Sequence, residues 1–410
     1  MDNRAGPPTS GAAEPTGPTQ PTHPNAAADS APATGPATAP GTAPGTAPAT
    51  ASVRGLGHDV HVLDTRLAGH AGLTSAYLVA GSAPCLVETG TSTSVPTVVA
   101  ALHELGLGAD DLATLVVTHI HLDHAGGVGE LARAFPRATV AVHPAGARHL
   151  VDPQRLLAGT RAVFGAEVMD RVIGTLAPTE AARIVALANG DRLDLGDGRA
   201  LTAVDSPGHA RHHLGLLDSL TGDLYVGDAA GMWFADTQEV RPATPPPDFD
   251  LVAALDSLRR FASLQPTRLL FTHYGPATDV PTTLERAAHE LRVWVDEVAA
   301  LRRGSPRTAG HTADASDTDD TGESGGAARP PDAAGNAARA VGPPSRGRSH
   351  DLDHAVAAVL DRDRQRYAYA QRDPELAAAV ALLSSPDANT HGVWDWLTRT
   401  SEPGYGFPAE

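Results

Sequence analysis

Short apolar runs bounded by glycine or proline recur along the chain and predict β-strands. Three early runs are rich in Val, Leu and Tyr, and they occupy residues 58–65, 74–80 and 84–89. A fourth run, residues 112–117, is apolar throughout, as expected for a strand buried on both faces. Later runs occupy residues 138–143, 199–207, 213–218, 223–228 and 268–273. The last of these is expected to be the final buried strand.

Helical patterns alternate with these strands. The clearest helix has Ser94 as a candidate N-cap, Pro96 in its first turn and Gly106 at its end. Its apolar face is formed by Val95, Val98, Val99, Leu102 and Leu105. Further helical patterns occupy residues 128–135, 144–180, 249–262 and 283–298. Mixed strands and helices in two halves predict an α/β fold, an αββα sandwich in which two sheets face each other and helices lie outside.

Two polar segments are excluded from the folded part of the chain. Residues 1–51 are mostly Ala, Pro and Thr, and residues 304–350 are polar and partly acidic. Both have too few large apolar side chains to offset the entropy of ordering them, so we expect a disordered tail and a disordered linker. The main domain is therefore assigned to residues 52–303.

Two further helices are expected in residues 351–400. The first has an apolar face made of Leu352, Val356, Val359 and Leu360. The second begins at Asp373, which is followed by proline and glutamate, a strong signal for a helix N-terminus. Because neither helix can bury its apolar face alone, both are expected to pack on the main domain.

Charge and composition exclude several classes of protein. The net charge is -17 and the chain contains no lysine, which argues against a strong nucleic-acid or anionic-membrane binder. Cys85 is the only cysteine, so neither an intramolecular disulfide nor a multi-cysteine zinc site is possible. No apolar run reaches the length of a membrane span, and the N-terminus lacks the apolar stretch of a secretory signal. A cytoplasmic location is the expectation.

A dense group of metal-binding side chains follows the apolar run at 112–117. His119, His121, Asp123 and His124 place three imidazoles and one carboxylate within six residues. A loop at a strand end can turn alternate side chains toward one point. Imidazole nitrogen and carboxylate oxygen are the usual ligands of zinc and of non-haem iron. The cluster therefore predicts a metal site.

Three more candidate ligands lie at strand ends downstream. His209 stands in SPGHA, Asp228 in YVGDA and His273 in FTHYG. Each follows a short apolar strand and has glycine next to it or two residues away. The chain has 19 histidines, so a single histidine carries little weight. The order and the context of these three indicate that they join the cluster.

The motifs THIHLDHAGG, SPGHA, VGDA and THYG resemble the successive metal motifs of the metallo-β-lactamase superfamily, over roughly residues 54–300. The resemblance implies two divalent metal ions, with zinc as the first choice and iron or manganese as alternatives. It implies that one metal is held by His119, His121 and His209, the other by Asp123, His124 and His273, and that Asp228 bridges them. A hydroxide shared by the metals would attack a small-molecule substrate. Catalytic roles fall to Asp123 and Asp228.

Departures from the family pattern limit which branches of the superfamily the chain can resemble. Glu88 stands where an early strand usually ends in aspartate, and it is expected to support a ligand rather than to bind metal. The combination of His124 and Asp228 argues against a true β-lactamase. The chain is placed in the glyoxalase-II-like metallo-hydrolase branch, although the Lys, Arg and Tyr set that holds glutathione is not recognisable. An ester, a thioester, a lactone and a phosphoester all remain open as substrates.

Two other functions stay open. A mononuclear iron oxidoreductase of the persulfide-dioxygenase kind shares most of these ligands, and metal content with oxygen uptake would separate it from the hydrolase. A non-catalytic binding protein is disfavoured because all seven ligands are present. A homodimer is one option for the oligomeric state.

Several other residues receive a structural interpretation. His212 and His213 are expected to be structural or solvent-facing, and His143 and His149 structural. For Tyr225 and Tyr274, packing is favoured over a role as donors to the substrate. Residues 232–234 are expected either to line an apolar pocket or to pack a loop, and Cys85 to be a small core residue.

Overall fold

The computed structural model describes residues 52–304, 350–372, 374–383 and 386–401. The expected tail, almost all of the expected linker and Asp373 lie outside the described residues. Among the described helices, none combines the length and the apolarity needed to cross a membrane.

The first half of the described chain builds a seven-stranded sheet in strand order β1 to β7. Its strands are β1 (Val53–Gly57), β2 (Val60–Asp64), β3 (Ser75–Val79), β4 (Cys85–Val87), β5 (Thr114–Val116), β6 (Thr139–Val142) and β7 (Ile184–Ala186). Pairing is antiparallel from β1 to β4 and parallel from β4 to β7. The parallel part requires helical crossovers, which is why helices follow β4 and β5 in the sequence.

The second half builds a six-stranded sheet in the order β15-β14-β11-β10-β9-β8. The strands are β8 (Arg192–Asp194), β9 (Ala200–Asp205), β10 (Leu214–Asp218), β11 (Asp223–Gly227), β14 (Arg268–Phe271) and β15 (Gly275–Ala277). Only β11 and β14 pair in parallel, and the other neighbours are antiparallel. A separate two-stranded ribbon consists of β12 (Met232–Phe234) and β13 (Glu239–Arg241).

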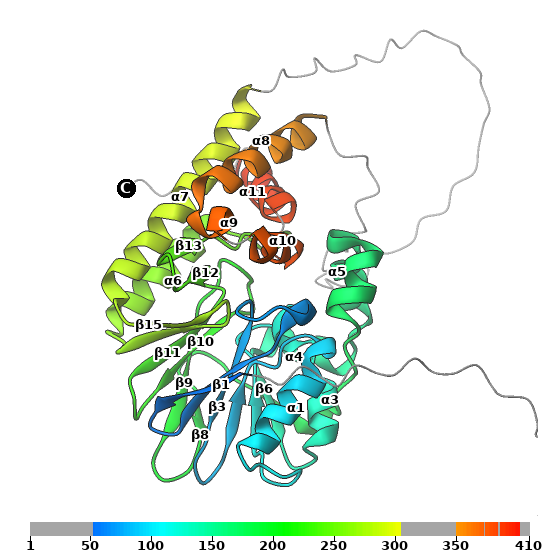
Figure 1. Ribbon diagram of the computed structural model, residues 1–410, viewed down its shortest axis with the longest axis vertical. Coiled ribbons are helices and arrows are strands. Elements are labelled where there is room, and N and C mark those ends of the chain that lie inside the picture. The colour runs from blue at the N-terminus through cyan, green and yellow to red at the C-terminus, as the bar shows by residue number, and fades with distance from the viewer. Residues whose placement is uncertain (1–51, 305–349, 373, 384–385, 402–410) are drawn as a thin grey trace, which may run out of the picture. The chain divides into compact units, whose positions relative to one another are not determined.

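Helices lie on the outer faces of the two sheets (Figure 1). The helices of the first half are α1 (Val95–Glu104), α2 (Leu122–Ala125), α3 (Val128–Ala134), α4 (Pro144–Val151) and α5 (Gln154–Val168), followed by a π-helical turn, η3 (Met169–Ile173). Short 3₁₀ turns are η1 (Leu67–Gly69), η2 (Ser92–Ser94) and η4 (Ala181–Arg183). The later helices are α6 (Leu251–Ser263), α7 (Val280–Gly304), α8 (His350–Arg366), α9 (Ala368–Arg372), α10 (Pro374–Leu383) and α11 (Pro386–Thr400).

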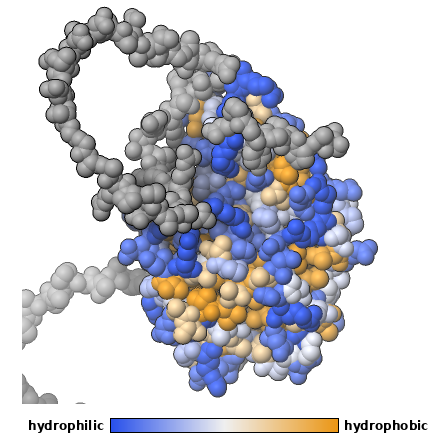
Figure 2. All heavy atoms as spheres, turned by 180° about the vertical axis from the view of Figure 1, so that it is seen from behind, coloured by the Kyte–Doolittle hydropathy of each residue, from blue (hydrophilic) through white to orange (hydrophobic). Residues whose placement is uncertain are grey.

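Three apolar layers confirm the αββα sandwich. The inner layer joins side chains of both sheets, including Tyr77 and Val116 from the first and Leu216 and Tyr225 from the second. One outer layer packs α1 and α3 on the first sheet, and the other packs α6 and α7 on the second. In the face shown in Figure 2, apolar residues gather in the lower half among polar ones.

The C-terminal helices contact the main body through a fourth apolar cluster. Phe249 and Trp294 meet Val359 of α8 and Val393 and Trp396 of α11 in this cluster. The aromatic rings of Phe249 and Trp396 are edge to face, 6.2 Å apart. These contacts give the apolar faces of α8 and α11 a partner.

Several expectations about elements were wrong. The strand at 268–271 is not the last, because β15 follows it. The segment 144–180 is largely helical as expected, but its last helical turn ends at Ile173. The C-terminal region holds four helices among the described residues, not two. Ser94 stands at the N-cap of α1, but its hydroxyl lies 3.0 Å from that of Thr91 and does not cap the helix.

Candidate metal centre

The candidate ligands come from loops that leave the strands of both sheets. The segment from His119 to His124 follows β5, and Asp123 and His124 lie in the single turn of α2. His209 stands between β9 and β10, Asp228 directly follows β11, and His273 follows β14. Because the two sheets are stacked, these loops meet at one edge of the sandwich, and the structure brings all seven side chains together.

The first ligand set consists of three imidazoles. His121 Nδ1 lies 2.9 Å from His119 Nε2 and 2.8 Å from His209 Nε2. His119 and His209 are buried, whereas His121 is half-buried. Three ring nitrogens that converge this closely match the three-histidine donor set of a zinc site.

The second ligand set mixes imidazole and carboxylate donors. Asp123 Oδ2 lies 3.6 Å from His124 Nε2 and 3.3 Å from His273 Nε2. The two imidazole Nε2 atoms are 3.3 Å apart. The side chain of Asp123 is 20% exposed, so this set reaches the surface through its carboxylate.

Asp228 lies between the two sets. Its Oδ1 is 3.2 Å from His124 Nε2 and 3.5 Å from His273 Nε2. Its Oδ2 is 3.5 Å from His209 Nε2, in the other set. The two carboxylate oxygens therefore face different groups of imidazoles, which is the arrangement that a bridging ligand requires.

The remote ring nitrogens of three imidazoles are held by neighbouring oxygen atoms. His209 Nδ1 lies 3.0 Å from the carbonyl oxygen of Ala243, and His273 Nδ1 lies 3.0 Å from that of Leu73. His119 Nδ1 lies 3.0 Å from the hydroxyl of Thr118. A carbonyl can only accept, so His209 and His273 donate from Nδ1, and each leaves a lone pair on Nε2 that points into the site.

Glu88 supports the second set, as its position on an early strand suggests. Its Oε1 lies 3.3 Å from His124 Nδ1 and accepts from the hydroxyls of Thr118 and Thr272. Glu88 is buried, and its backbone φ of 68° lies in the left-handed region. It belongs to none of the groups of converging ligand atoms in the described residues.

Burial and neighbouring charges shift histidine pKa values downward in the first set and upward in the second. Burial and the adjacent imidazoles lower the pKa of His119 and of His121. Burial also opposes protonation of His124, but Asp228, Asp123 and Glu88 raise its pKa well above the usual value. For Asp228, burial opposes ionisation, yet His124, His273 and His209 hold its pKa well below the usual range.

The donor set fits bound metal. Three carboxylates lie within 3.6 Å of the fully buried His124 ring, namely those of Glu88, Asp123 and Asp228. Buried negative charge at this density needs positive charge beside it. In the first set, ring nitrogens 2.8–2.9 Å apart would repel one another if each pointed a lone pair at the other without a proton or a cation between them.

Sequence comparison agrees with this geometry. The sequence model of the metallo-beta-lactamase superfamily matches residues 70–273, a range that includes all seven candidate ligands. The chain belongs to the metallo-β-lactamase superfamily. This membership confirms the resemblance seen in the motifs.

Individual members of the superfamily are distant. A metallo-beta-lactamase fold-containing protein of Sulfurisphaera tokodaii is 30% identical over 174 residues, which are 40% of this chain and 62% of that protein. The match thus spans less than two thirds of that relative. A hydroxyacylglutathione hydrolase of Synechococcus sp. is 27% identical over 230 residues, or 53% of this chain and 74% of the relative. A crystal structure of an archaeal metallo-beta-lactamase superfamily protein from Sulfolobus tokodaii shares 25% identity with a TM-score of 0.49, and the match covers 63% of this chain and 91% of that one.

His213 organises the site of this superfamily member, although sequence reasoning assigned it no role there. It is buried, so the solvent-facing alternative is wrong. Its Nδ1 lies 2.7 Å from the hydroxyl of Ser206, and its Nε2 accepts from the backbone N–H of Asp228 at 3.1 Å. Gly227 permits this approach, because a Cβ there would lie 2.5 Å from both His213 Nε2 and Thr118 Oγ1.

His212 also borders the first set. Its ring stacks on that of His119 with centroids 6.3 Å apart. Its Nδ1 is buried and has no hydrogen-bond partner among the described residues. Burial lowers the pKa of His212 to about 4. In the sequence, only the position of His212 three residues after His209 indicated that it lies near the site. That position does not distinguish a buried histidine from an exposed one.

The other residues with a structural interpretation lie outside the ligand sets. Tyr225 packs edge to face against Tyr77 in the inner layer, with centroids 5.4 Å apart. His143 accepts from Ala145 N and caps α4. Residues 232–234 form the buried strand β12, and the backbone N–H of Tyr274 donates to the carbonyl of Trp233 at 3.1 Å. Cys85 is a buried core residue of β4.

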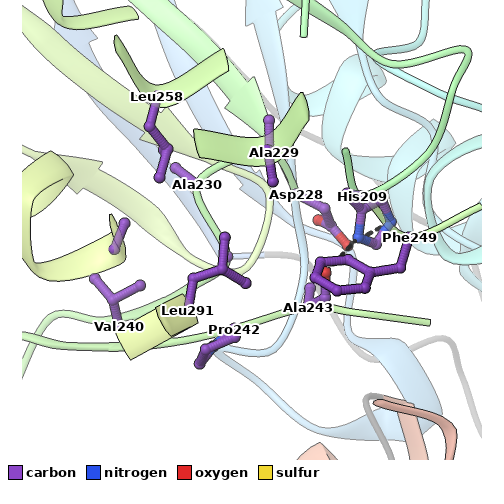
Figure 3. Close-up of a pocket in the computed structure, with 13 residues that line it drawn as sticks. His209, Asp228, Ala229, Ala230, Val240, Pro242, Ala243, Phe249, Leu258 and Leu291 are labelled. Carbon is purple, nitrogen blue, oxygen red and sulfur yellow. Dashed lines mark hydrogen bonds and ion pairs between the residues drawn. The ribbon is translucent and has the colours of Figure 1, made fainter. Parts of the chain in front are cut away.

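His209 and Asp228 border a mostly apolar cavity (Figure 3). Its wall includes Ala243, Phe249 and Leu291. Its volume of about 20 Å³ has room for about one water molecule. It is too small for an organic substrate, so a substrate must approach from the side where His121 and Asp123 are partly exposed.

Proposed function

We propose that this chain is a metal-dependent hydrolase with a dinuclear centre, acting on an ester, thioester, lactone or phosphoester of small size. Zinc is the first choice of metal, and iron or manganese are the alternatives. One metal would be held by His119, His121 and His209, and the other by Asp123, His124 and His273. Asp228 would bridge the two, and we place the protein in the cytoplasm.

The observation that carries this proposal is the orientation of Asp228. Each of its oxygens lies within 3.5 Å of imidazole nitrogens from a different ligand set. A site for a single metal would not need a carboxylate that faces two converging groups. The complete second set, with its own carboxylate Asp123, supports the same conclusion.

A pair of metal ions would lower the pKa of a bound water and stabilise the negative charge that develops on the substrate. The chain contributes fixed geometry. His209 and His273 are held by backbone carbonyls, so little reorganisation accompanies the reaction. Asp228 fixes the distance between the two ligand sets, because its two oxygens contact imidazoles of both. Asp123 reaches the partly exposed edge, and we assign to it the role of holding the second metal where a substrate would approach.

The named relatives and the composition of the chain both bear on the substrate class. Relatives from Synechococcus and Vibrio are named hydroxyacylglutathione hydrolases, which makes thioesters a natural first test. The chain has no lysine, so any anionic substrate would have to be held by arginine, by backbone N–H groups or by the metals. Esters, lactones and phosphoesters stay in the panel.

The test couples metal analysis to a substrate panel. Protein loaded with zinc, manganese or iron is analysed for metal content and is then assayed on thioesters, esters, lactones and phosphodiesters. The proposal expects two metals per chain and turnover that a chelator abolishes. The variant His103→Ala, which removes an exposed imidazole on α1, serves as the control and should behave like the wild type. One iron per chain with oxygen uptake on a persulfide would instead support the mononuclear oxidoreductase.

A further inference from the structure

The C-terminal helix α11 contacts the segment that orients His209. The carboxamide of Asn389 lies against residues 242–244, which follow β13. Asn389 is 2% exposed and Thr244 is fully buried. The superfamily match ends at residue 273, so this contact comes from a part of the chain beyond the matched range.

Asn389 uses both ends of its carboxamide in this contact. Its Oδ1 accepts from the backbone N–H of Thr244 at 2.8 Å, and its Nδ2 donates to the carbonyl of Pro242 at 3.3 Å. The hydroxyl of Thr244 donates in turn to the backbone carbonyl of Asn389 at 3.0 Å. Three hydrogen bonds therefore fix α11 and this segment relative to each other in a buried place.

The peptide bond between Ala243 and Thr244 links Asn389 to the metal site. Its N–H donates to Asn389, and its carbonyl oxygen lies 3.0 Å from His209 Nδ1. One peptide unit is thus held at both ends, by α11 on one side and by the His209 imidazole on the other. Hydrogen bonds in such a chain polarise one another, so a bond at the N–H strengthens the carbonyl as an acceptor.

Two further features show that α11 is fitted to this segment. A Cβ on Gly392, one turn after Asn389, would overlap the carbonyl oxygen of Thr244, so only glycine permits the approach. Arg399 donates to the carbonyl of Phe249 at 2.8 Å. Phe249 lies beside His209 and Asp228 in the wall of the cavity (Figure 3).

We propose that Asn389 is a positioning residue for His209. It holds the Ala243–Thr244 peptide so that the carbonyl keeps the proton of His209 on Nδ1 and keeps Nε2 directed at the first metal. This role rests on the proposed metal centre. It means that the C-terminal helix α11 helps to orient a metal ligand. Direct hydrogen-bond partners of a metal ligand typically change metal affinity by about 10- to 100-fold when they are removed. Asn389 acts one hydrogen bond further out, so we expect the lower end of that range.

The test measures stepwise zinc affinity by competition with a chromophoric chelator, together with melting temperature. Asn389→Ala should weaken the first metal about tenfold and leave the second unchanged. Thr244→Val is the matched control, because it removes a hydrogen bond from the same contact but leaves the peptide N–H in place. It should lower the melting temperature and leave both zinc affinities at the wild-type value.

A double-mutant cycle assigns the effect to His209. In a His209→Ala background, Asn389→Ala should cause no further loss of zinc affinity, since the residue it positions is already absent. An equal loss in both backgrounds would overturn the proposal. So would a loss of affinity in Thr244→Val that matches that of Asn389→Ala, because that result would indicate general loosening of the helix.

Asn389→Asp covers the case in which Asn389→Ala does not fold. Aspartate keeps an acceptor for the Thr244 N–H, but it replaces the donor to Pro242 with an oxygen and adds a negative charge. The proposal then expects a lower melting temperature with both zinc affinities unchanged, and loss of the first metal would contradict it. A wild type that binds two zinc ions while Asn389→Ala keeps both affinities contradicts this role alone. A wild type that binds no metal contradicts the proposed function as well.

Discussion

Glu88 occupies a backbone conformation that costs free energy. Its φ of 68° lies in the left-handed region. This conformation costs about 1–2 kcal/mol for residues other than glycine, asparagine and aspartate. The carboxylate placed by this conformation meets His124, Thr118 and Thr272. The contacts made by one buried side chain thus offset a local strain, and they fix the ring of a candidate ligand.

Glu88→Gln tests this supporting role. Glutamine keeps one oxygen acceptor but removes the negative charge beside His124 Nδ1. The affinity of the second metal should fall by about 10- to 100-fold while the fold and the first metal persist. Chelator competition measures this, with Glu104→Gln at the exposed end of α1 as the control. Complete loss of both metals would mean that Glu88 is itself a ligand.

At the scale of elements, the buried strands and their terminal residues could be predicted from sequence. The candidate ligands lie in the short segments that follow apolar runs, so local sequence places them near strand ends. The strands missed were short or lay at sheet edges. β7 and β8 have three residues each with mostly exposed or half-exposed side chains, and β15 is Gly-Pro-Ala. Such segments carry no alternation of apolar and polar residues, and only tertiary pairing makes them strands.

The contacts that support the candidate ligands also depend on tertiary structure, so they could not be predicted from sequence. His213, Ala243 and Leu73 act through partners that are distant in sequence or through their backbone carbonyls. A carbonyl is present in every residue and leaves no sequence signal. The candidate ligands themselves could be picked out in the sequence because three imidazoles and a carboxylate within six residues are a rare combination.

Gly208 shows how one helix positions a ligand loop. Its φ is +133°, and a Cβ there would contact the backbone of Ala254 in α6. Gly208→Ala should therefore push α6 from the loop that carries His209. The free energy of unfolding should fall by about 1–3 kcal/mol, and the first metal should bind more weakly.

Thermal melting and zinc competition check this prediction. Gly159→Ala in the exposed part of α5 is the matched control, because a Cβ there meets nothing within 4 Å. It should leave zinc affinity unchanged and stability equal or slightly higher. Equal behaviour of the two variants would show that α6 does not constrain the loop.

At the scale of the molecule, α8 and α11 complete a surface that α6 and α7 leave apolar. Besides the shared cluster around Phe249 and Trp294, Arg366 pairs with Glu290 at 2.8 Å and with Glu297 at 3.1 Å. Partly buried ion pairs of this kind contribute little net stability, so the apolar cluster carries most of the attachment. We therefore propose that residues 351–400 belong to the same folding unit as residues 52–303.

A protease site inserted within residues 305–349 tests this proposal. After cleavage, the two fragments should co-elute in size-exclusion chromatography and melt in a single transition. Trp396→Ala and Val393→Ala remove buried side chains from the shared cluster, and they should promote separation of the cleaved fragments. A C-terminal fragment that separates cleanly and melts on its own would instead be an independent domain.

The most direct test of the metal centre is the metal stoichiometry of Asp228→Ala against the wild type, measured by elemental analysis after loading and desalting. Asp228 is the one candidate whose two oxygens face both ligand sets. The wild type should hold about two metals per chain, and Asp228→Ala about one, with most hydrolysis lost and the fold retained. A wild type that never exceeds one metal per chain with zinc, manganese or iron would contradict the dinuclear centre.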